Sequence, residues 1–256
     1  MTEGRKIVLI LEYNGANYAG FQYQKGQPTV QEKLEEAIYR LTGEKIRIIG
    51  ASRTDSGVHA LGQVVSFRTG SRLPKEAFVR GLNYHLPRDI AVREAYAVAE
   101  PVNIRSEAIS REYHYHILNR TTPSPLRSGF SYLVREVLDA DLMNEACRML
   151  LGEHDFTSFA SSLTGTRLKS GVRKVYQAEV TREKELVVFK MVANSFLPHQ
   201  VRSTVGSLIR VGLRKMSTED FYSIIGAKKP GLAGPLVPAR GLFLIRVNYP
   251  YSFEDK

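Results

Sequence analysis

Hydrophobic residues form two kinds of pattern along the first hundred residues, continuous apolar runs and repeats at helical spacing. The apolar run KIVLILEY (6–13) is typical of a buried strand. Thr29 and Glu32 form a capping-box pattern, and apolar residues recur behind them at helical spacing until Gly43, so a helix is predicted there. The full set of expected elements is strands at 6–13, 46–49, 64–67 and 90–98, with helices at 29–43 and 74–85.

The second part of the chain nearly repeats this strand-helix-strand-strand-helix-strand order. Strands are expected at 112–119, 172–181, 186–193 and 242–249, and helices at 141–151 (with Gly152 as the stop signal), 199–214 and 218–225. Residues 182–185 lie between two strands and predict a hairpin. Hairpins interleaved with helices favour an α+β fold of two similar halves, 1–104 and 105–256, over a purely parallel sheet. The duplication rests on element order alone.

Composition limits the class of protein. The 256 residues are 43% hydrophobic and 24% charged, which suits a globular protein with a large core. The single cysteine, Cys147, excludes internal disulfides and CxxC motifs. No apolar run reaches the roughly 18–20 residues of a membrane span, and the N-terminus lacks a signal-peptide layout. We therefore expect a cytoplasmic protein that does not enter a membrane.

The formal net charge of +10 indicates a polyanionic partner. Two long windows, 156–178 and 186–218, contain no acidic residue. Their basic residues are Arg167, Lys169, Arg173, Lys174, Lys190, Arg202, Arg210, Arg214 and Lys215. A solvated basic surface is the simpler interpretation, but two such windows favour a phosphate-binding face in the second half.

Motifs for nucleotide hydrolysis and for common metal sites are absent, including GxxxxGK[ST], GxGxxG, HExxH and GxSxG. Asp55, Ser56 and His59 are too close in sequence to align as a hydrolase triad.

The predicted strand 112–119 has two faces of different chemical character. Glu112, His114 and His116 share a face that could bind a metal, although a solvated strand face is the commoner origin of such a pattern. Tyr113 and Tyr115 lie on the opposite face, where they would be core residues or line a cleft and stack on a base.

The segment 51–67, ASRTDSGVHALGQVVSF, places Arg53 and Asp55 in a tight connection between two predicted strands. Taken alone, Asp55-Ser56-Gly57 is typical of a turn. However, SRTDSGVHALGQVVSF closely resembles the GRTDxGVHAxxQVxxF signature of the tRNA pseudouridine synthases of the TruA type. Ser52 stands where that family usually has Gly.

Four further motifs support the resemblance over nearly the whole chain, in the family's order: EYNGANYAGFQYQ with the helix start PTVQ, REYHY (111–115), SFLPHQVR (195–202) and PARGLFL (238–244). Pro198 stands where His is common. The resemblance implies the pseudouridine synthase fold, an α+β pair of similar halves with a central, mainly antiparallel sheet flanked by helices and a positively charged cleft. It also implies a homodimer, no cofactor and no metal. The implied substrates are uridines at positions 38, 39 and 40 of the tRNA anticodon stem-loop.

The resemblance also assigns roles to single residues. Asp55, in the half 1–104, would be the catalytic nucleophile, and whether it attacks C1′, attacks C6 or removes a sugar proton stays open. Arg53 would fill the gap left by the flipped uridine. Tyr113 would stack on the uracil, Arg202 would pair with Asp55, and Leu242 would form an apolar wall of the pocket.

Two other functions compete with this one. A non-catalytic RNA-binding module would use the basic face without needing Asp55. A metal-dependent enzyme would use Glu112, His114 and His116.

Overall fold

The computed structural model describes residues 4–98, 102–160 and 170–256. The chain forms two compact units. Unit 1 comprises the chain up to Arg111 together with Phe243–Lys256, and unit 2 comprises Glu112–Leu242. These units differ from the predicted ranges 1–104 and 105–256 mainly because the last strand of the chain pairs within unit 1.

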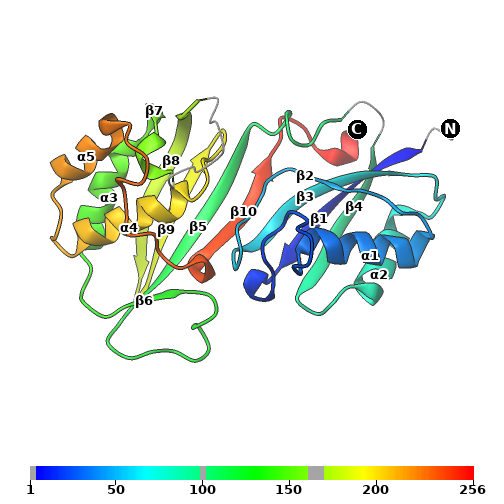
Figure 1. Ribbon diagram of the computed structural model, residues 1–256, viewed down its shortest axis with the longest axis horizontal. Helices are drawn as coiled ribbons and strands as arrows, with labels where there is room; N and C mark the ends of the chain where they lie inside the picture. The colour runs from blue at the N-terminus through cyan, green and yellow to red at the C-terminus, as the bar shows by residue number, and fades with distance from the viewer. Residues whose placement is uncertain (1–3, 99–101, 161–169) are drawn as a thin grey trace. The chain divides into compact units, whose positions relative to one another are not determined.

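Unit 1 follows the predicted order of elements (Figure 1). These are β1 (Arg5–Tyr13), α1 (Val30–Thr42), β2 (Ile49–Gly50), β3 (His59–Thr69), α2 (Lys75–His85), β4 (Ile90–Val98) and β10 (Leu242–Asn248). Their strand order is β4-β1-β3-β10, with β2 added to β3. β1 is antiparallel to β3 and β4, whereas β10 runs parallel to β3.

The signals at the ends of α1 act as expected. The Thr29 side chain accepts a hydrogen bond from the backbone N–H of Glu32 at 3.3 Å and so caps the helix. Gly43 ends the helix in the left-handed conformation, at φ 75°, which glycine adopts without strain. The buried face of α1 includes Leu34 and Ile38, which lie at helical spacing.

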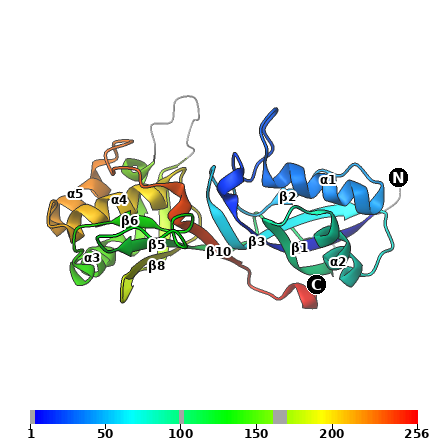
Figure 2. The same cartoon turned by 90° about the horizontal axis from the view of Figure 1, so that it is seen from below.

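Unit 2 contains all but the first two residues of β5 (Ser110–Asn119), together with β6 (Tyr132–Val134), α3 (Ala140–Cys147), β7 (Gly152–Asp155), β8 (Val172–Glu183), β9 (Leu186–Ala193), α4 (Gln200–Gly212) and α5 (Thr218–Ala227). Its strand order is β5-β9-β8-β7, with β6 parallel to β5. β8 and β9 form the predicted hairpin. The helices α3, α4 and α5 contact one another, and Figures 1 and 2 show them gathered together in this unit.

The prediction of a mixed α+β fold with mainly antiparallel strands and flanking helices is confirmed. No helix in the described part of the chain is long and apolar enough to cross a membrane.

Three local predictions differ from the structure. The expected strand at 46–49 is reduced to β2, because the backbone N–H of Ile48 donates to the Glu35 carboxylate instead of a neighbouring strand. The helix expected at 141–151 tightens into a 3-10 turn after Cys147, where the backbone N–H of Arg148 is shared between two carbonyls. Gly152 begins β7 rather than ending that helix.

Candidate active site

The loop 51–58 of unit 1 carries two of the predicted site residues. It connects β2 to β3, which are paired antiparallel. Arg53 is exposed, Asp55 is half-buried, and Thr54 between them is buried. The residues that the structure describes form no ion pair or hydrogen bond with the Arg53 side chain. The loop therefore presents two charged side chains while its central threonine anchors it.

Buried polar side chains fix the first part of this loop. Gln63, fully buried in β3, accepts from the backbone N–H of Ser52 at 3.2 Å and donates to its carbonyl at 2.8 Å. The Tyr13 hydroxyl lies 2.7 Å from Thr54 Oγ1. Each anchor is within three residues of Asp55, so β1 and β3 determine the path of the backbone there.

A second segment, residues 14–21, supports the loop along its length. The backbone N–H of Phe21 donates to the Thr54 carbonyl at 3.1 Å, and the Ser56 hydroxyl donates to the Tyr18 carbonyl at 3.1 Å. A Cβ at Gly15 would lie 2.0 Å from the Val58 carbonyl oxygen, so only glycine permits this approach. The signature 12–24 and the signature 52–67, separate in sequence, are thus one structural unit.

Arg111 ties the start of β5 to the same loop. Its guanidinium donates to the carbonyls of Ala108 (3.1 Å), Arg105 (2.9 Å) and, at the long distance of 3.4 Å, Ala51. Arg111 is buried, and its charge is surrounded by carbonyl oxygens, which suits a structural role.

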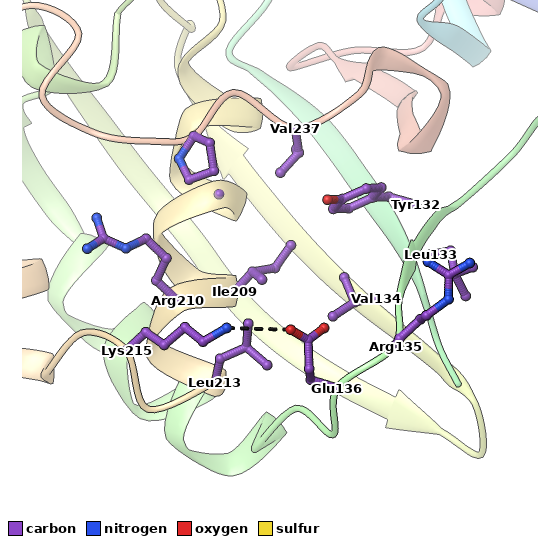
Figure 3. A pocket seen from close by; sticks show the side chains of 12 residues that line it. Tyr132, Leu133, Val134, Arg135, Glu136, Ile209, Arg210, Leu213, Lys215 and Val237 are labelled. Atoms are coloured by element: carbon purple, nitrogen blue, oxygen red, sulfur yellow. Dashed lines mark hydrogen bonds and ion pairs between the residues drawn. The ribbon is translucent and has the colours of Figure 1, made fainter. Parts of the chain in front are cut away.

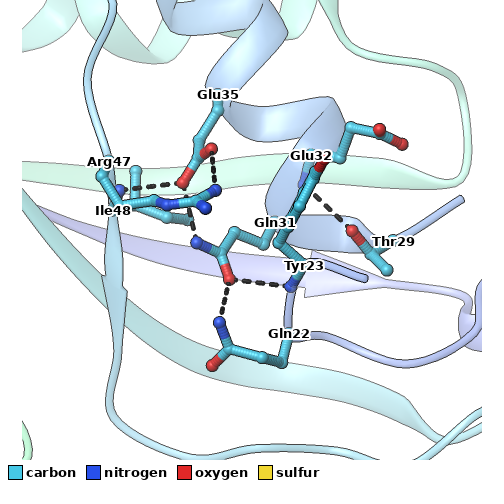
Figure 4. A network of polar contacts seen from close by, with 8 residues as sticks. All are labelled: Gln22, Tyr23, Thr29, Gln31, Glu32, Glu35, Arg47 and Ile48. Carbon is cyan, nitrogen blue, oxygen red and sulfur yellow. Dashed lines mark hydrogen bonds and ion pairs between the residues drawn. The ribbon is translucent and has the colours of Figure 1, made fainter. Parts of the chain in front are cut away.

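A polar network on α1 holds both segments that flank the loop (Figure 4). Gln31 accepts from Gln22 Nε2 and from the backbone N–H of Tyr23, and it donates to Glu35 at 2.7 Å. Glu35 in turn accepts from the backbone of Ile48 at 3.1 Å and also pairs with an exposed arginine, Arg47, at 2.9 Å. Helix α1 therefore positions the chain before β2 as well as residues 22–23, which directly follow the 14–21 segment.

Tyr113 and Arg202 occupy unit 2. Tyr113 lies in β5, is buried, and packs edge-on against Phe196 with ring centroids 5.0 Å apart. Arg202, in the first turn of α4, donates from Nε to the Val237 carbonyl at 2.8 Å. This bond fixes the guanidinium of Arg202 to the segment that contains Val237.

Leu242 ends unit 2 and is buried, as expected for a wall residue. The segment leading to it packs closely on β5, since a Cβ at Gly241 would lie 2.7 Å from the Tyr115 ring. The Tyr115 hydroxyl donates to the Pro238 carbonyl at 2.7 Å. Burial raises the pKa of Tyr115 above its ordinary value, while the nearby Arg202 charge acts in the opposite direction.

The structure thus groups the predicted residues in two sets, Arg53 with Asp55 on one loop, and Tyr113, Arg202 and Leu242 in unit 2. The predicted Arg202–Asp55 pair stays a prediction. Sequence reasoning assigned no role to Gln63 or Arg111, although both stand inside the quoted motifs QV and REYHY.

The alternative metal site does not have the expected free carboxylate. Glu112 is buried, and its Oε1 lies 2.8 Å from His114 Nε2 and 3.7 Å from Lys190 Nζ. Among the described residues no group of three His, Cys, Asp or Glu side chains is arranged to hold a metal ion. The face is therefore partly buried and ion-paired, rather than simply solvated.

Acidic residues from other segments of the chain pair with three basic residues of the window 186–218. Lys190 pairs with Glu112 and Glu179, Arg214 with Asp139 at 2.9 Å, and Lys215 with Glu136 at 3.5 Å. Arg210 forms no such pair among the residues described. Arg167 and Lys169 of the other window lie outside the described residues.

Comparison with known proteins gives a consistent result. A family model described as tRNA pseudouridine synthase matches residues 9–105 and 146–250. The chain is 42% identical to tRNA pseudouridine synthase A of Acetivibrio thermocellus, over 96% of this chain and 100% of that protein. It is 39% identical to tRNA pseudouridine synthase A of Francisella tularensis subsp. novicida, over 98% of this chain and 96% of that protein.

In three dimensions the chain has a distant likeness to the crystal structure of the archaeal box H/ACA sRNP Nop10–Cbf5 complex, with a TM-score of 0.39 and 13% identity over 80% of this chain and 44% of that chain. The sequence matches are decisive by themselves. The family model spans well over half of the chain, and relatives of about 40% identity align nearly end to end. This chain belongs to the tRNA pseudouridine synthase family.

Proposed function

We propose that this protein isomerises uridine to pseudouridine in tRNA, at positions 38, 39 and 40 of the anticodon stem-loop, with Asp55 as the nucleophile. Membership of the family supports the reaction and the substrate class. The resemblance of the segment 52–67 to the family signature supports the choice of Asp55.

The reaction is balanced without a redox or hydrolytic partner. The N1–C1′ bond breaks, the uracil turns, and a C5–C1′ bond forms. The proton at C5 is then lost, and N1 gains one, so no atom is added or removed. Asp55 either bonds covalently to the substrate and leaves again, or removes a sugar proton and returns it to the same carbon as the C5–C1′ bond forms. No cofactor is required by this balance.

The residues of the site have complementary roles in this proposal. Arg53, exposed beside Asp55, replaces the extruded nucleotide in the stem and contacts a phosphate. Tyr113 stacks on the uracil, Arg202 keeps Asp55 ionised and oriented, and Leu242 excludes water.

One observation carries the proposal for Asp55. The loop that holds it is anchored on the N-terminal side of Asp55 by two buried groups, Gln63 at Ser52 and Tyr13 at Thr54. A turn whose only purpose was to reverse the chain would not need two such buried polar anchors. Rigid support is what a nucleophile requires, because its position must match the reacting atom closely.

The test is to map pseudouridine in unmodified tRNA after incubation with the pure protein, with and without EDTA. Wild-type protein should modify positions 38–40 in both conditions. Asp55→Asn should bind tRNA with nearly wild-type affinity and form no pseudouridine, whereas the control Asp141→Asn, an exposed change on α3, should be fully active. Turnover by Asp55→Asn near the wild-type rate would overturn the nucleophile assignment, and loss of activity in EDTA would favour the metal-dependent alternative.

The resemblance further supports a cytoplasmic homodimer, which we include in the proposal. Light scattering coupled to size exclusion would check it, with about twice the chain mass of 28.8 kDa expected.

A further inference from the structure

Unit 2 contains a pocket of about 480 Å³ between α4 and the segment that includes β6 (Figure 3). A volume of this size is within the range of sites for small ligands. Its lining residues are Tyr132, Leu133, Val134, Arg135, Glu136, Gly206, Ile209, Arg210, Leu213, Lys215, Pro235 and Val237. None of these residues has a role in the function proposed above.

The pocket is built by a close approach of two segments. A Cβ at Gly206 would lie 1.7 Å from the Pro235 carbonyl oxygen, so the glycine lets this chain segment lie directly on α4. Arg202 holds the same segment by donating to the Val237 carbonyl at 2.8 Å. The wall formed by 235–237 is therefore fixed by backbone contacts on α4.

The residues that line the pocket carry a net positive charge, even though Lys215 and Glu136 form an ion pair within it. Lys215 and Glu136 neutralise each other across 3.5 Å, as the dashed line in Figure 3 shows. Arg135 and Arg210 remain, so three cations and one carboxylate leave a formal charge of +2. Both arginines are exposed, and neither forms a hydrogen bond or ion pair through its side chain with the residues that the structure describes.

The remaining lining is apolar and includes one aromatic ring. Ile209, Leu213 and Val237 contribute aliphatic surface, and Tyr132 lies toward Val237 in Figure 3, away from the Lys215–Glu136 pair. Tyr132 and Arg210 lie on different sides of the lining in Figure 3, so an aromatic wall and a guanidinium without an ion pair to the described residues both belong to this pocket. These two features match a molecule with a flat base and an anionic phosphate. Bases stack favourably on aromatic side chains, and arginine suits phosphate oxygens.

We propose that this pocket binds a nucleoside monophosphate unit, with its phosphate at Arg210 and its base against Tyr132. That the unit is a nucleotide of the tRNA rests on the proposed function; a free nucleotide carries the same chemistry. Glu136 does not oppose this assignment, since its charge is already matched by Lys215.

The first arm of the experiment compares Arg210→Gln with Arg148→Gln, an identical change at an exposed arginine of unit 2 outside the pocket. The Kd for unmodified tRNA is measured from 50 to 200 mM salt. Arg210→Gln should weaken binding about 5- to 10-fold and reduce the slope of log Kd against log salt by about 1. Arg148→Gln should stay within about twofold. Tyr132→Ala should weaken binding about tenfold without changing the slope, since stacking involves no charge.

The second arm identifies the source of the nucleotide. UMP and AMP are titrated into wild-type protein and Arg210→Gln by NMR. Weaker tRNA binding by Arg210→Gln supports an RNA nucleotide, whereas UMP or AMP binding that is lost in Arg210→Gln while tRNA affinity is unchanged supports a free nucleotide. Equal tRNA affinities for Arg210→Gln and Arg148→Gln, together with no binding of UMP or AMP, would overturn the proposal. Pseudouridine formation by the wild type is scored separately, so failure of the proposed function is distinguished from failure of the pocket.

Discussion

The loop 51–58 is held mainly by hydrogen bonds to backbone atoms, whereas the basic segment 186–218 engages most of its cations in ion pairs or backbone contacts. Gln63 and Phe21 hold the loop through the peptide groups of Ser52 and Thr54. By contrast, Arg214 and Lys215 pair with carboxylates while remaining exposed. The bonds from Gln63 and Phe21 thus join uncharged groups, whereas the ion pairs of the basic segment join charged groups and are screened by salt.

This difference fits two tasks. Buried hydrogen bonds to a loop lose much when one partner is removed, which keeps Asp55 in one position. Exposed ion pairs contribute only about 0–1 kcal/mol each, so their cations can exchange a carboxylate for a phosphate at little cost. Chemistry requires the first property and binding of a polyanion benefits from the second.

The largest effect is expected from a substitution at Gly15, where the 14–21 segment approaches the loop closely. Gly15→Ala would force a methyl group to within 2.0 Å of the Val58 carbonyl oxygen, and a backbone atom cannot move aside as a side-chain tip can. We expect unfolding to become easier by at least about 2–3 kcal/mol and activity to be lost. Urea denaturation measures the change in the free energy of unfolding.

Gly129→Ala is the matched control, because nothing lies within 4 Å of the added methyl group and the backbone there has no left-handed conformation. It should change the free energy of unfolding by no more than about 0.5 kcal/mol. Equal stability of the two variants would show that the 14–21 segment does not restrain the loop.

Gln63 tests the loop without a steric clash. Gln63→Leu removes both hydrogen bonds between the Gln63 side chain and the backbone of Ser52, at a cost of about 1–3 kcal/mol. Single-turnover pseudouridine formation should slow by roughly 10- to 100-fold, which corresponds to that range, while the Kd for tRNA changes less than about twofold.

Gln63→Glu serves as the companion variant, since its carboxylate can still accept from the Ser52 N–H but can no longer donate to the Ser52 carbonyl. It should recover part of the lost rate. A loss of tRNA affinity equal to the loss of rate in Gln63→Leu would mean that the loop supports binding rather than positioning.

These anchors also show how far sequence reasoning could go. The strand β1 was predictable because residues 6–13 form a run rich in apolar side chains. The helix α1 was predictable because Thr29 caps its first turn. Strands of three or four residues, such as β6 and β7, have no readable period. Their place is set by partners on other strands, which a single sequence does not reveal.

Charge was harder to predict than secondary structure for a related reason. Arg214 and Asp139 are 75 residues apart in sequence, yet they form an ion pair. A window that contains no acid therefore says little about which cations stay unpaired. Arg53 and Asp55 could be singled out from the sequence because both belong to one short motif, whereas Arg210 is distinguished from its basic neighbours only in the folded chain.

Tyr113 gives a smaller effect and separates stacking from proton transfer. Tyr113→Phe keeps the ring and its edge-on contact with Phe196, while Tyr113→Leu removes the ring. We expect the hydroxyl to take part in catalysis, so Tyr113→Phe should bind tRNA normally and turn over about tenfold more slowly, within the range of general acid–base effects. Tyr113→Leu should in addition bind more weakly, since base stacking contributes roughly 1–3 kcal/mol. Near-wild-type rates in both variants would make Tyr113 a core residue only.

The smallest effect is expected in the pH dependence of the ion pair between Asp139 and Arg214. The Leu142 backbone N–H that Asp139 caps, together with Arg214, holds the pKa of this carboxyl below its ordinary value. A lowered pKa in the folded state contributes stability that is complete above the ordinary pKa of about 3.9 and is lost as the pH falls through the lower, folded value. Asp139→Asn keeps a capping oxygen but cannot titrate, so its urea midpoint should fall less than that of the wild type between pH 5 and pH 3. The control Asp141→Asn, two residues along the same helix, makes no side-chain hydrogen bond or ion pair with the described residues and should follow the wild-type curve. An Asp139→Asn curve that also coincided with that of the wild type would show that the charge of Asp139, on the Leu142 cap and in the Arg214 pair, contributes nothing to folding stability.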